Sequence, residues 1–442
     1  MTAPAGPGTP LWQLLQSVAA LLQEVDRGRS LSARLDHVPV ARRPAVQALS
    51  FELMRQLGRA RALVRRLAQR PPAPAVEALL ATALALLSAE VPAYPEHTLV
   101  SQAVEAARRQ KSTQAQSGFI NACLRRFQRE RTALMADVMQ DPVARYNHPA
   151  WWIERLQQDH PAHWQDLLAA AQQAPPLTLR VNRQRSSVAQ TLAQLQAMGL
   201  AAEPVGVDGL QLRQAVPVHA LPGFDEGAVS VQDAAAQLAA PLLLQGLALD
   251  RPWRMLDACA APGGKTGHLL EMAPQARVTA LEIDPARTGR IEDNLHRLGL
   301  QAEVRTADAG RPADWWTGEP WDAILLDAPC TASGIVRRHP DIRWLRRPTD
   351  SAQLAQTQAR LLDTLWPTLR TGGRMLYCTC SVFRAEGDEV IQAFLMRNKA
   401  ARILQPVGHL IPSVMPSGLP VGDNRLGEHD GFYYALLEKS GP

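Results

Sequence analysis

Hydrophobic residues in the first third of the chain recur every three or four positions, as they do along amphipathic helices. The spacing predicts helices over residues 11–25, 45–67, 76–87, 97–108 and 118–139. Gly28 and the proline-rich stretch at residues 71–74 separate these periodic runs. Because no strand-like alternation interrupts them, we predict an all-helical domain over residues 1–143.

The pattern changes after Pro175 and Pro176. Residues 148–171 still read as helical, but residues 177–181 alternate as a strand does, and residues 187–198 read as a helix before a short strand near residues 210–212. We therefore predict a helical linker followed by a small α+β module over residues 144–228.

From residue 229 onward, short apolar runs alternate with amphipathic segments. The runs at residues 254–258, 277–283, 303–306, 322–326 and 374–378 read as strands, and residues 266–271, 286–298 and 351–366 read as helices. Such alternation predicts an α/β domain of the Rossmann-like, doubly wound type, with a mostly parallel sheet over residues 229–442.

Composition narrows the class of protein without identifying it. The chain has 442 residues, 46% of them hydrophobic and 20% charged, as in ordinary globular proteins. Five cysteines, an odd number in a long chain, disfavour a disulfide framework, and their spacing matches no metal site. There is no signal-peptide pattern, and the longest apolar stretch is too short to span a bilayer. We expect a cytoplasmic protein without metal or membrane attachment.

The positive charge is concentrated near the amino terminus. Residues 1–143 hold 18 Lys and Arg against 11 Asp and Glu, whereas the rest of the chain is nearly neutral. Arg125, Arg126 and Arg129 lie on the polar side of the predicted helix over residues 118–139. Such a basic face fits a nucleic-acid contact, or equally a solvated surface without a partner.

Acidic residues follow successive predicted strands behind a glycine turn. The first strand runs into the sequence DACAAPGGKT at residues 257–266, where glycine permits a sharp turn and a close approach to a ligand. Glu282 ends the second strand and suits a ribose diol, and Asp308 follows the third and suits an adenine amino group. Together they favour a nucleoside cofactor, with the turn formed by Cys259, Ala260, Ala261, Pro262, Gly263, Gly264 and Lys265.

Two cysteines follow the last two strands of the predicted parallel sheet. Cys330 ends the sequence DAPC, which begins at Asp327, and Cys380 lies in CTCS. Either cysteine alone would be read as a small buried hydrophobe, but a pair at strand ends points to chemistry. The proline after Asp327, beside a nucleoside pocket, suggests methyl transfer from S-adenosylmethionine to a ring. A thiolate that adds to C6 of a pyrimidine would make its C5 nucleophilic for that transfer.

The motifs CAAPGGKT, LDAPC and CTCS, in this order, resemble those of the Nol/Nop/Sun group of RNA 5-methylcytosine methyltransferases. The match covers roughly residues 229–438 and includes Asp430-Gly-Phe-Tyr-Tyr434. The helical amino-terminal region resembles a NusB-like RNA-binding domain. Together with residues 337–344, this pairing resembles the bacterial Sun/Fmu (RsmB-type) family, which methylates a cytosine in small-subunit (16S) ribosomal RNA.

The resemblance implies a role for each matched residue. Cys380 would be the nucleophile, Cys330 would assist proton removal and release, and Asp327 would hydrogen-bond the cytosine near N3 and also contact the cofactor. The turn at residues 259–265, with Glu282 and Asp308, would hold S-adenosylmethionine. Cys378 falls inside a strand and is read as core, whereas Lys265 either orients a carboxylate or holds the turn.

Arg337, Arg338 and His339 directly follow the loop that carries Cys330 and, with Arg343, are candidate RNA contacts. Trp344 either stacks on a base or packs as an anchor. The expected partner is small-subunit ribosomal RNA, with no obligate protein partner. Transfer RNA as the substrate and a non-catalytic RNA-binding or assembly factor are the alternatives. A DNA enzyme is disfavoured, because such enzymes use the cysteine of the PC motif as nucleophile.

Overall fold

The computed structural model describes residues 8–412, 417–421 and 424–441, and it divides the chain into two compact units. The first, called the helical unit here, comprises Met1–Gln172 and Val336–Pro348. The second, called the sheet unit, comprises Gln173–Ile335 and Thr349–Pro442. These divisions differ from the three consecutive segments expected from the sequence, because residues 144–172 and 336–348 join the helical unit.

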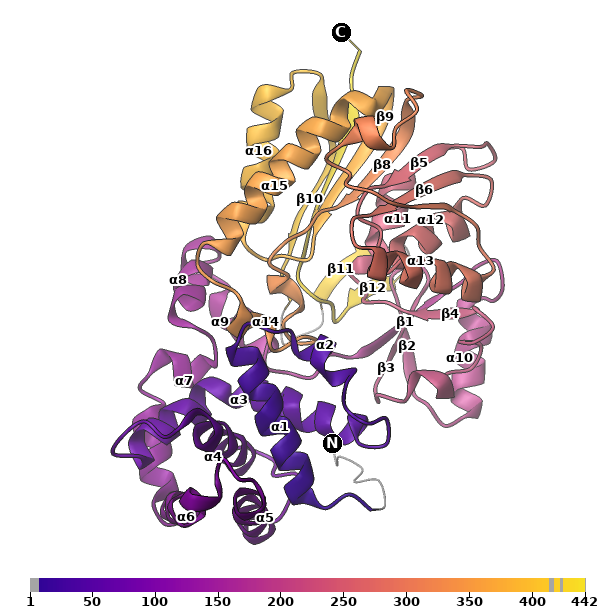
Figure 1. The fold of residues 1–442 in the computed structure, drawn as a ribbon. Coiled ribbons are helices and arrows are strands. Elements are labelled where there is room, and N and C mark those ends of the chain that lie inside the picture. Colours follow the sequence, from indigo (N-terminus) through magenta and orange to yellow (C-terminus); the bar gives the residue numbers. More distant parts are fainter. Residues whose placement is uncertain (1–7, 413–416, 422–423, 442) are drawn as a thin grey trace. The chain divides into compact units, whose positions relative to one another are not determined.

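The helical unit is built around α4 (Pro74–Leu87), in which every residue from Ala78 to Leu87 is buried. The neighbouring helices pack their leucine-rich faces on it (Figure 1). The helices predicted from the spacing of hydrophobic residues are therefore confirmed. The other helices of this unit are α1 (Leu11–Asp26), α2 (Leu31–Leu35), α3 (Arg43–Leu67), α5 (Glu96–Arg109), α6 (Ser117–Val138), α7 (Pro142–Tyr146), α8 (Ala150–Asp159), α9 (Trp164–Ala170) and α14 (Ile342–Leu345).

Specific hydrogen bonds connect the segment Val336–Pro348 to the rest of the helical unit. Asp341 Oδ2 accepts from the amide of Leu31 at 2.9 Å, and Trp344 Nε1 donates to the carbonyl of Met54 at 2.9 Å. The guanidinium of Arg343 is fully buried and donates to the carbonyl of Ala171 at 2.7 Å. Of the two readings of Trp344, the structure favours the packed anchor.

The sheet unit contains a seven-stranded sheet in the order β10-β13-β9-β8-β5-β6-β7. The five strands from β9 to β7 are parallel, and two antiparallel strands close one edge. A mostly parallel sheet is therefore confirmed. The strands are β5 (Arg254–Asp257), β6 (Arg277–Glu282), β7 (Glu303–Thr306), β8 (Trp321–Asp327), β9 (Leu369–Thr379), β10 (Ala401–Leu410) and β13 (Phe432–Lys439), and β11 (Ser417–Val421) pairs separately with β12 (Asn424–Gly427).

Helices cover both faces of this sheet (Figure 1). Met255 and Leu325 belong to the core shared with α11 (Ala239–Leu244), α12 (Gly264–Met272) and α13 (Pro285–Leu298). Their neighbours Leu256 and Ile324 face the core shared with α15 (Asp350–Leu365) and α16 (Asp388–Arg397). Alternate residues of each strand thus enter opposite cores, as expected for a sheet buried on both sides.

The small module forms a separate antiparallel sheet within the sheet unit, in the order β2-β3-β1-β4. Its helix starts at a capping box, in which the Ser187 hydroxyl accepts from the Gln190 amide while the Gln190 side chain accepts from the Ser187 amide. The module comprises β1 (Leu177–Val181), α10 (Val188–Ala197), β2 (Ala202–Val205), β3 (Gly209–Leu212) and β4 (Val229–Val231).

Candidate active site

The sulfur atoms of Cys330 and Cys380 lie 3.4 Å apart, within hydrogen-bonding distance for thiols. Cys330 follows β8 and Cys380 follows β9, and these strands are parallel neighbours. The hydrogen bond to Cys380 and burial together raise the pKa of the Cys330 thiol well above its ordinary value. Cys330 therefore keeps its proton at neutral pH and can donate it to the sulfur of Cys380.

Asp327 is the last residue of β8 and carries an ion pair into the same site. Its Oδ2 accepts from Lys265 Nζ at 2.6 Å, and its Oδ1 accepts from Cys378 Sγ at 3.5 Å. Burial alone lowers the pKa of Lys265, but the Asp327 carboxylate outweighs this effect and the pKa is raised. Lys265 thus stays charged and orients Asp327, which is one of the two roles considered for it.

Cys378 is fully buried within β9, as predicted, and burial raises the pKa of its thiol. Because that thiol is directed at Asp327 Oδ1 and not at Cys330 or Cys380, it completes the hydrogen bonding of the carboxylate. This placement makes Cys378 a supporting residue of the site.

The buried side chain of Glu386 ties the two cysteine loops together. Its Oε1 accepts from the amide of Thr331 at 2.8 Å, and its Oε2 accepts from the hydroxyls of Thr331 at 2.5 Å and Ser381 at 2.6 Å. Thr331 follows Cys330 and Ser381 follows Cys380, so one carboxylate holds both loops. Glu386 was not among the predicted site residues, because no local pattern distinguishes it from the neighbouring acids Asp388 and Glu389.

Two glycines let the backbone close next to Cys380. The amide of Gly334 donates to the carbonyl of Cys380 at 2.9 Å, and the amide of Gly431 donates to the carbonyl of Gly334 at 2.9 Å. A Cβ atom on Gly334 would meet the Gly431 carbonyl oxygen at 2.0 Å. Any side chain at Gly334 would therefore push apart the loops that place the sulfur of Cys380.

The glycine turn after β5 packs tightly against α13. Gly263 has φ +91°, and a Cβ atom there would lie 3.1 Å from the side chain and 3.2 Å from the backbone of Ile291. A residue with a side chain at position 263 would therefore have a strained backbone and would crowd Ile291.

Before the turn, Asp257 is fully buried and accepts from the Thr266 hydroxyl at 2.6 Å. Burial raises the pKa of Asp257 to about 7.

Glu282 and Asp308 lie at the carboxyl ends of β6 and β7, as predicted. Glu282 is 4% exposed, and its Oε1 accepts from the amide of Asp284 at 3.0 Å. Asp308 Oδ1 accepts from the amide of Gly310 at 2.8 Å. Because β5, β6 and β7 are adjacent and parallel, both carboxylates share one edge of the sheet with the glycine turn.

Models of three protein families match consecutive parts of the chain. The model of the 16S rRNA methyltransferase RsmB/F family matches residues 245–438. The ferredoxin-like domain of RsmF/B-like methyltransferases matches residues 148–219, and the NusB family matches residues 11–129.

Curated relatives extend the match over nearly the whole chain. Ribosomal RNA small subunit methyltransferase B of Pseudomonas syringae pv. tomato is 43% identical over 96% of this chain and 95% of its own length. The protein of the same name from Citrobacter koseri is 41% identical, over 97% and 99%. This chain belongs to the RsmB/F methyltransferase family.

Members of the RsmB/F family are RNA methyltransferases, and the predicted family resemblance and enzyme class are thereby confirmed. The predicted fold class is confirmed as well, since a NusB domain, a ferredoxin-like module and a methyltransferase domain follow one another. The solved structure of the protein PH0851 has this fold, with a TM-score of 0.74, 23% identity and coverage of 98% of this chain and 99% of that one.

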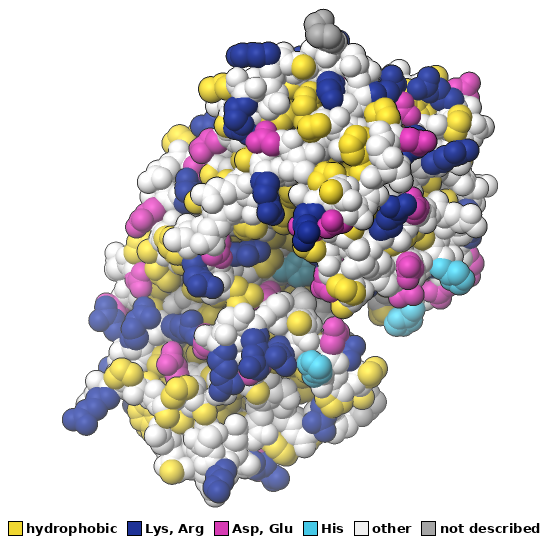
Figure 2. All heavy atoms as spheres, turned by 45° about the horizontal axis from the view of Figure 1, so that its top comes forward, with side chains coloured by type: hydrophobic (Ala, Val, Ile, Leu, Met, Phe, Trp, Pro, Cys, Tyr) yellow, Lys and Arg dark blue, Asp and Glu magenta, His cyan; other side chains and the backbone are white. Residues whose placement is uncertain are grey.

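The candidate RNA contacts of this RsmB/F family member differ in exposure. Arg125, Arg126 and Arg129 are exposed on α6, and Figure 2 shows many Lys and Arg side chains on the helical unit with few acidic ones between them. Arg338 and His339 are half-buried. Arg337 is only 3% exposed, so its guanidinium is buried, and its RNA contact stays a prediction.

Within the described residues, no cluster of three or more His, Cys, Asp or Glu side chains is placed to hold a metal ion. No helix in that same part of the chain is long and apolar enough to cross a membrane.

Proposed function

We propose that this protein methylates C5 of a cytosine in small-subunit (16S) ribosomal RNA, with S-adenosylmethionine as methyl donor and a covalent bond between Cys380 and C6 of the base. The observation that carries this proposal is the 3.4 Å approach of two cysteine sulfurs beside the Lys265–Asp327 ion pair. The protein's membership in the RsmB/F family and the names of its curated relatives support ribosomal RNA as the substrate.

The residues at the strand ends fit S-adenosylmethionine. Gly263 and Gly264 bring bare backbone to the edge of the sheet, where the methionine portion would lie. The nearly buried carboxylate of Glu282 suits the ribose hydroxyls, and Asp308 suits the adenine amino group. The bound cofactor supplies an electrophilic methyl group and leaves as a neutral thioether.

Cys380 begins the reaction as a thiolate, whose electron pair forms the bond to C6. The displaced ring electrons move to N3, which takes a proton from the Lys265–Asp327 pair. C5 of the resulting enamine then attacks the methyl group. The proton comes from the ammonium of Lys265, whose Nζ lies 2.6 Å from Asp327 Oδ2, and it passes through that carboxylate to N3.

Cys330 completes the reaction in two steps: its thiol first releases its own proton to solvent, and the resulting thiolate then removes the proton from C5. As the C5–C6 double bond forms again, the C6–sulfur electron pair returns to Cys380 and N3 gives its proton back to the Lys265–Asp327 pair. The proton that Cys330 held at the start goes to solvent, so one proton is released for each methyl group transferred. The raised pKa of Cys330 makes its thiolate a strong base for this step.

The proposal is tested by incubating the full chain with methyl-labelled S-adenosylmethionine and unmethylated 16S ribosomal RNA, transfer RNA or DNA. We expect label at C5 of a cytosine in the ribosomal RNA, identified after nuclease digestion by mass spectrometry. Label only in transfer RNA would overturn the substrate assignment. Absence of label from every RNA would overturn the proposed activity.

A further inference from the structure

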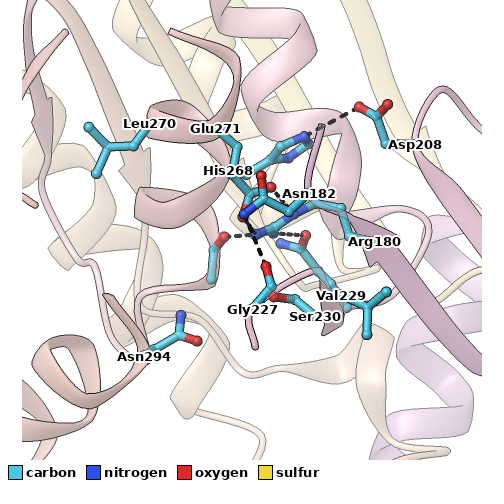
Figure 3. A network of polar contacts seen from close by, with 12 residues as sticks. Arg180, Asn182, Asp208, Gly227, Val229, Ser230, His268, Leu270, Glu271 and Asn294 are labelled. Atoms are coloured by element: carbon cyan, nitrogen blue, oxygen red, sulfur yellow. Dashed lines mark hydrogen bonds and ion pairs between the residues drawn. The ribbon is translucent and has the colours of Figure 1, made fainter. Parts of the chain in front are cut away.

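The small module binds α12, the helix that follows the glycine turn, through the buried side chain of Arg180. Arg180 of β1 is 1% exposed, and its Nε and Nη2 donate to the two carboxylate oxygens of Glu271 on α12 at 3.0 and 2.7 Å. Its Nη1 donates to the carbonyl of Gly264 at 2.8 Å and to Gln232 Oε1 at 2.5 Å. Figure 3 shows the guanidinium at the centre of this network.

The contact with Gly264 matters because this residue belongs to the glycine turn and is also the first residue of α12. A guanidinium that holds both Gly264 and Glu271, near opposite ends of a nine-residue helix, fixes the helix along its axis. Apolar packing alone would bury α12 without setting its position so sharply, because dispersion contacts have no direction.

Gln184 provides a second attachment at the other end of α12. Its Nε2 donates to the carbonyls of Leu270 at 2.8 Å and Glu271 at 3.0 Å. The last carbonyls of a helix have no partner within the helix, so a donor from outside stabilises that end. Residues of the module therefore hold both ends of the helix, one of them in the turn itself.

A third pair of polar side chains approaches between these two attachments. Asp208, in the turn between β2 and β3, places its Oδ2 4.0 Å from Nε2 of His268 in the middle of α12 (Figure 3). Both residues are buried. Polar side chains of the module thus lie against α12 at both ends and in its middle, and the contacts at the two ends are directional hydrogen bonds.

We propose that Arg180 and Gln184 are positioning residues for the S-adenosylmethionine turn, and that the ferredoxin-like module serves cofactor binding. Arg180 acts through the Gly264 carbonyl, which sets the orientation of the Gly263–Gly264 backbone toward the methyl donor. This inference rests on the proposed function, because it presupposes that the turn binds S-adenosylmethionine.

The main test uses the double variant Arg180→Met/Glu271→Met, measured as the full-length protein by calorimetric titration with S-adenosylmethionine. Replacing both partners of a buried ion pair by apolar residues of similar size is often neutral for stability, whereas removing one partner is not. We expect the Kd for S-adenosylmethionine to rise about tenfold, as for the loss of one charge-assisted hydrogen bond. The KM for RNA and kcat at saturating cofactor should stay unchanged.

Gln184→Ala is the second variant, chosen because Gln184 is an exposed residue whose replacement leaves the core intact. It should raise the Kd for S-adenosylmethionine by a smaller factor, about threefold, since only the distal end of α12 loses its donor. This variant keeps the inference testable if the double variant fails to fold.

Arg297→Met is the matched control. Arg297 of α13 also binds the module, through the carbonyls of Phe224 at 2.7 Å and Val229 at 3.1 Å, but none of its hydrogen bonds reaches α12 or the glycine turn. It should lower the melting temperature while the Kd for S-adenosylmethionine changes less than twofold.

The outcomes separate this inference from the proposed function. If the wild-type protein does not bind S-adenosylmethionine, the proposed function is wrong, and this inference falls with it. If the wild type binds but the folded Arg180 and Gln184 variants bind equally well, only the positioning role is wrong. An equal loss in Arg297→Met would assign the effect to module docking in general and would also overturn that role.

Discussion

Cys330 and Cys380 are separated by 50 positions in the sequence, yet their sulfur atoms lie 3.4 Å apart. The parallel pairing of β8 with β9 produces this approach, because Asp327 is in register with Cys378, and Cys330 and Cys380 follow them by three and two residues. Two thiols so close together can act on adjacent carbons of one pyrimidine ring. The proposed division of labour between them leads directly to a test.

Replacing either cysteine should stop turnover, but only one replacement should leave protein bound to RNA. Cys330→Ala retains the nucleophile and loses the base, so a covalent adduct should accumulate. Cys380→Ala should form no adduct. Denaturing gel electrophoresis of the protein with labelled RNA and S-adenosylmethionine distinguishes them, with Cys123→Ala, in the core of the helical unit, as the control. The reverse pattern would mean that the two roles are exchanged.

Glu386→Gln should reduce kcat by about tenfold or more, because an amide cannot replace all the acceptor contacts that hold Thr331 and Ser381. The network is buried, so we also expect a loss of about 1–3 kcal/mol in the free energy of unfolding. Steady-state kinetics and urea denaturation measure the two effects. The control is Glu389→Gln, an exposed neighbour on α16. Unchanged kcat in Glu386→Gln would show that the loops hold their positions without this carboxylate.

Asp257 should make the free energy of unfolding fall as the pH rises, which is unusual for an acid. Burial raises its pKa from 3.8 to about 7, so the folded protein keeps a proton that the unfolded chain has already released. Its contribution to stability is full at pH below 3.8 and is lost as the pH rises through about 7. Asp257→Asn removes this titration while an oxygen remains for the Thr266 hydroxyl. Relative to wild type, the variant should therefore gain about 3 kcal/mol between pH 5 and 8.

This comparison must be made as a difference between variant and wild type, because His268 acts in the opposite direction. Burial lowers the pKa of His268 to about 4, so its contribution is lost as the pH falls from 6.5 toward 4. Urea denaturation at several pH values gives both free energies of unfolding. A constant difference between Asp257→Asn and wild type would show that the Asp257 pKa is not raised.

Reversing the charges at Arg125, Arg126 and Arg129 should weaken RNA binding and reduce its dependence on salt by about one unit of slope for each lost phosphate contact. Filter binding at several salt concentrations measures this slope. The control reverses three exposed arginines of the sheet unit away from the carboxyl ends of the parallel strands, Arg277, Arg397 and Arg402. If RNA binding were weakened equally in both variants, the effect would come from net charge alone, and a specific basic face would be contradicted.

The sequence alone was sufficient for the parts that depend on local periodicity and on contiguous motifs. Helical spacing predicted α3 and α6 to within two residues at each end, and the strand predicted at residues 177–181 matches β1. Glu282, Asp308 and the glycine turn could be placed at one edge because the ends of parallel strands always meet there. The two cysteines were found for the same reason.

Tertiary structure decided everything that depends on a partner distant in the sequence. Arg337 and Arg343 belong to an Arg-rich stretch that suggests a nucleic-acid contact, but that stretch is inserted into the helical unit and both side chains are buried. Arg180 and Glu386 look like ordinary charged residues. Their roles arise because burial makes a charge costly unless every polar atom finds a partner, and only the folded chain determines which partners are within reach.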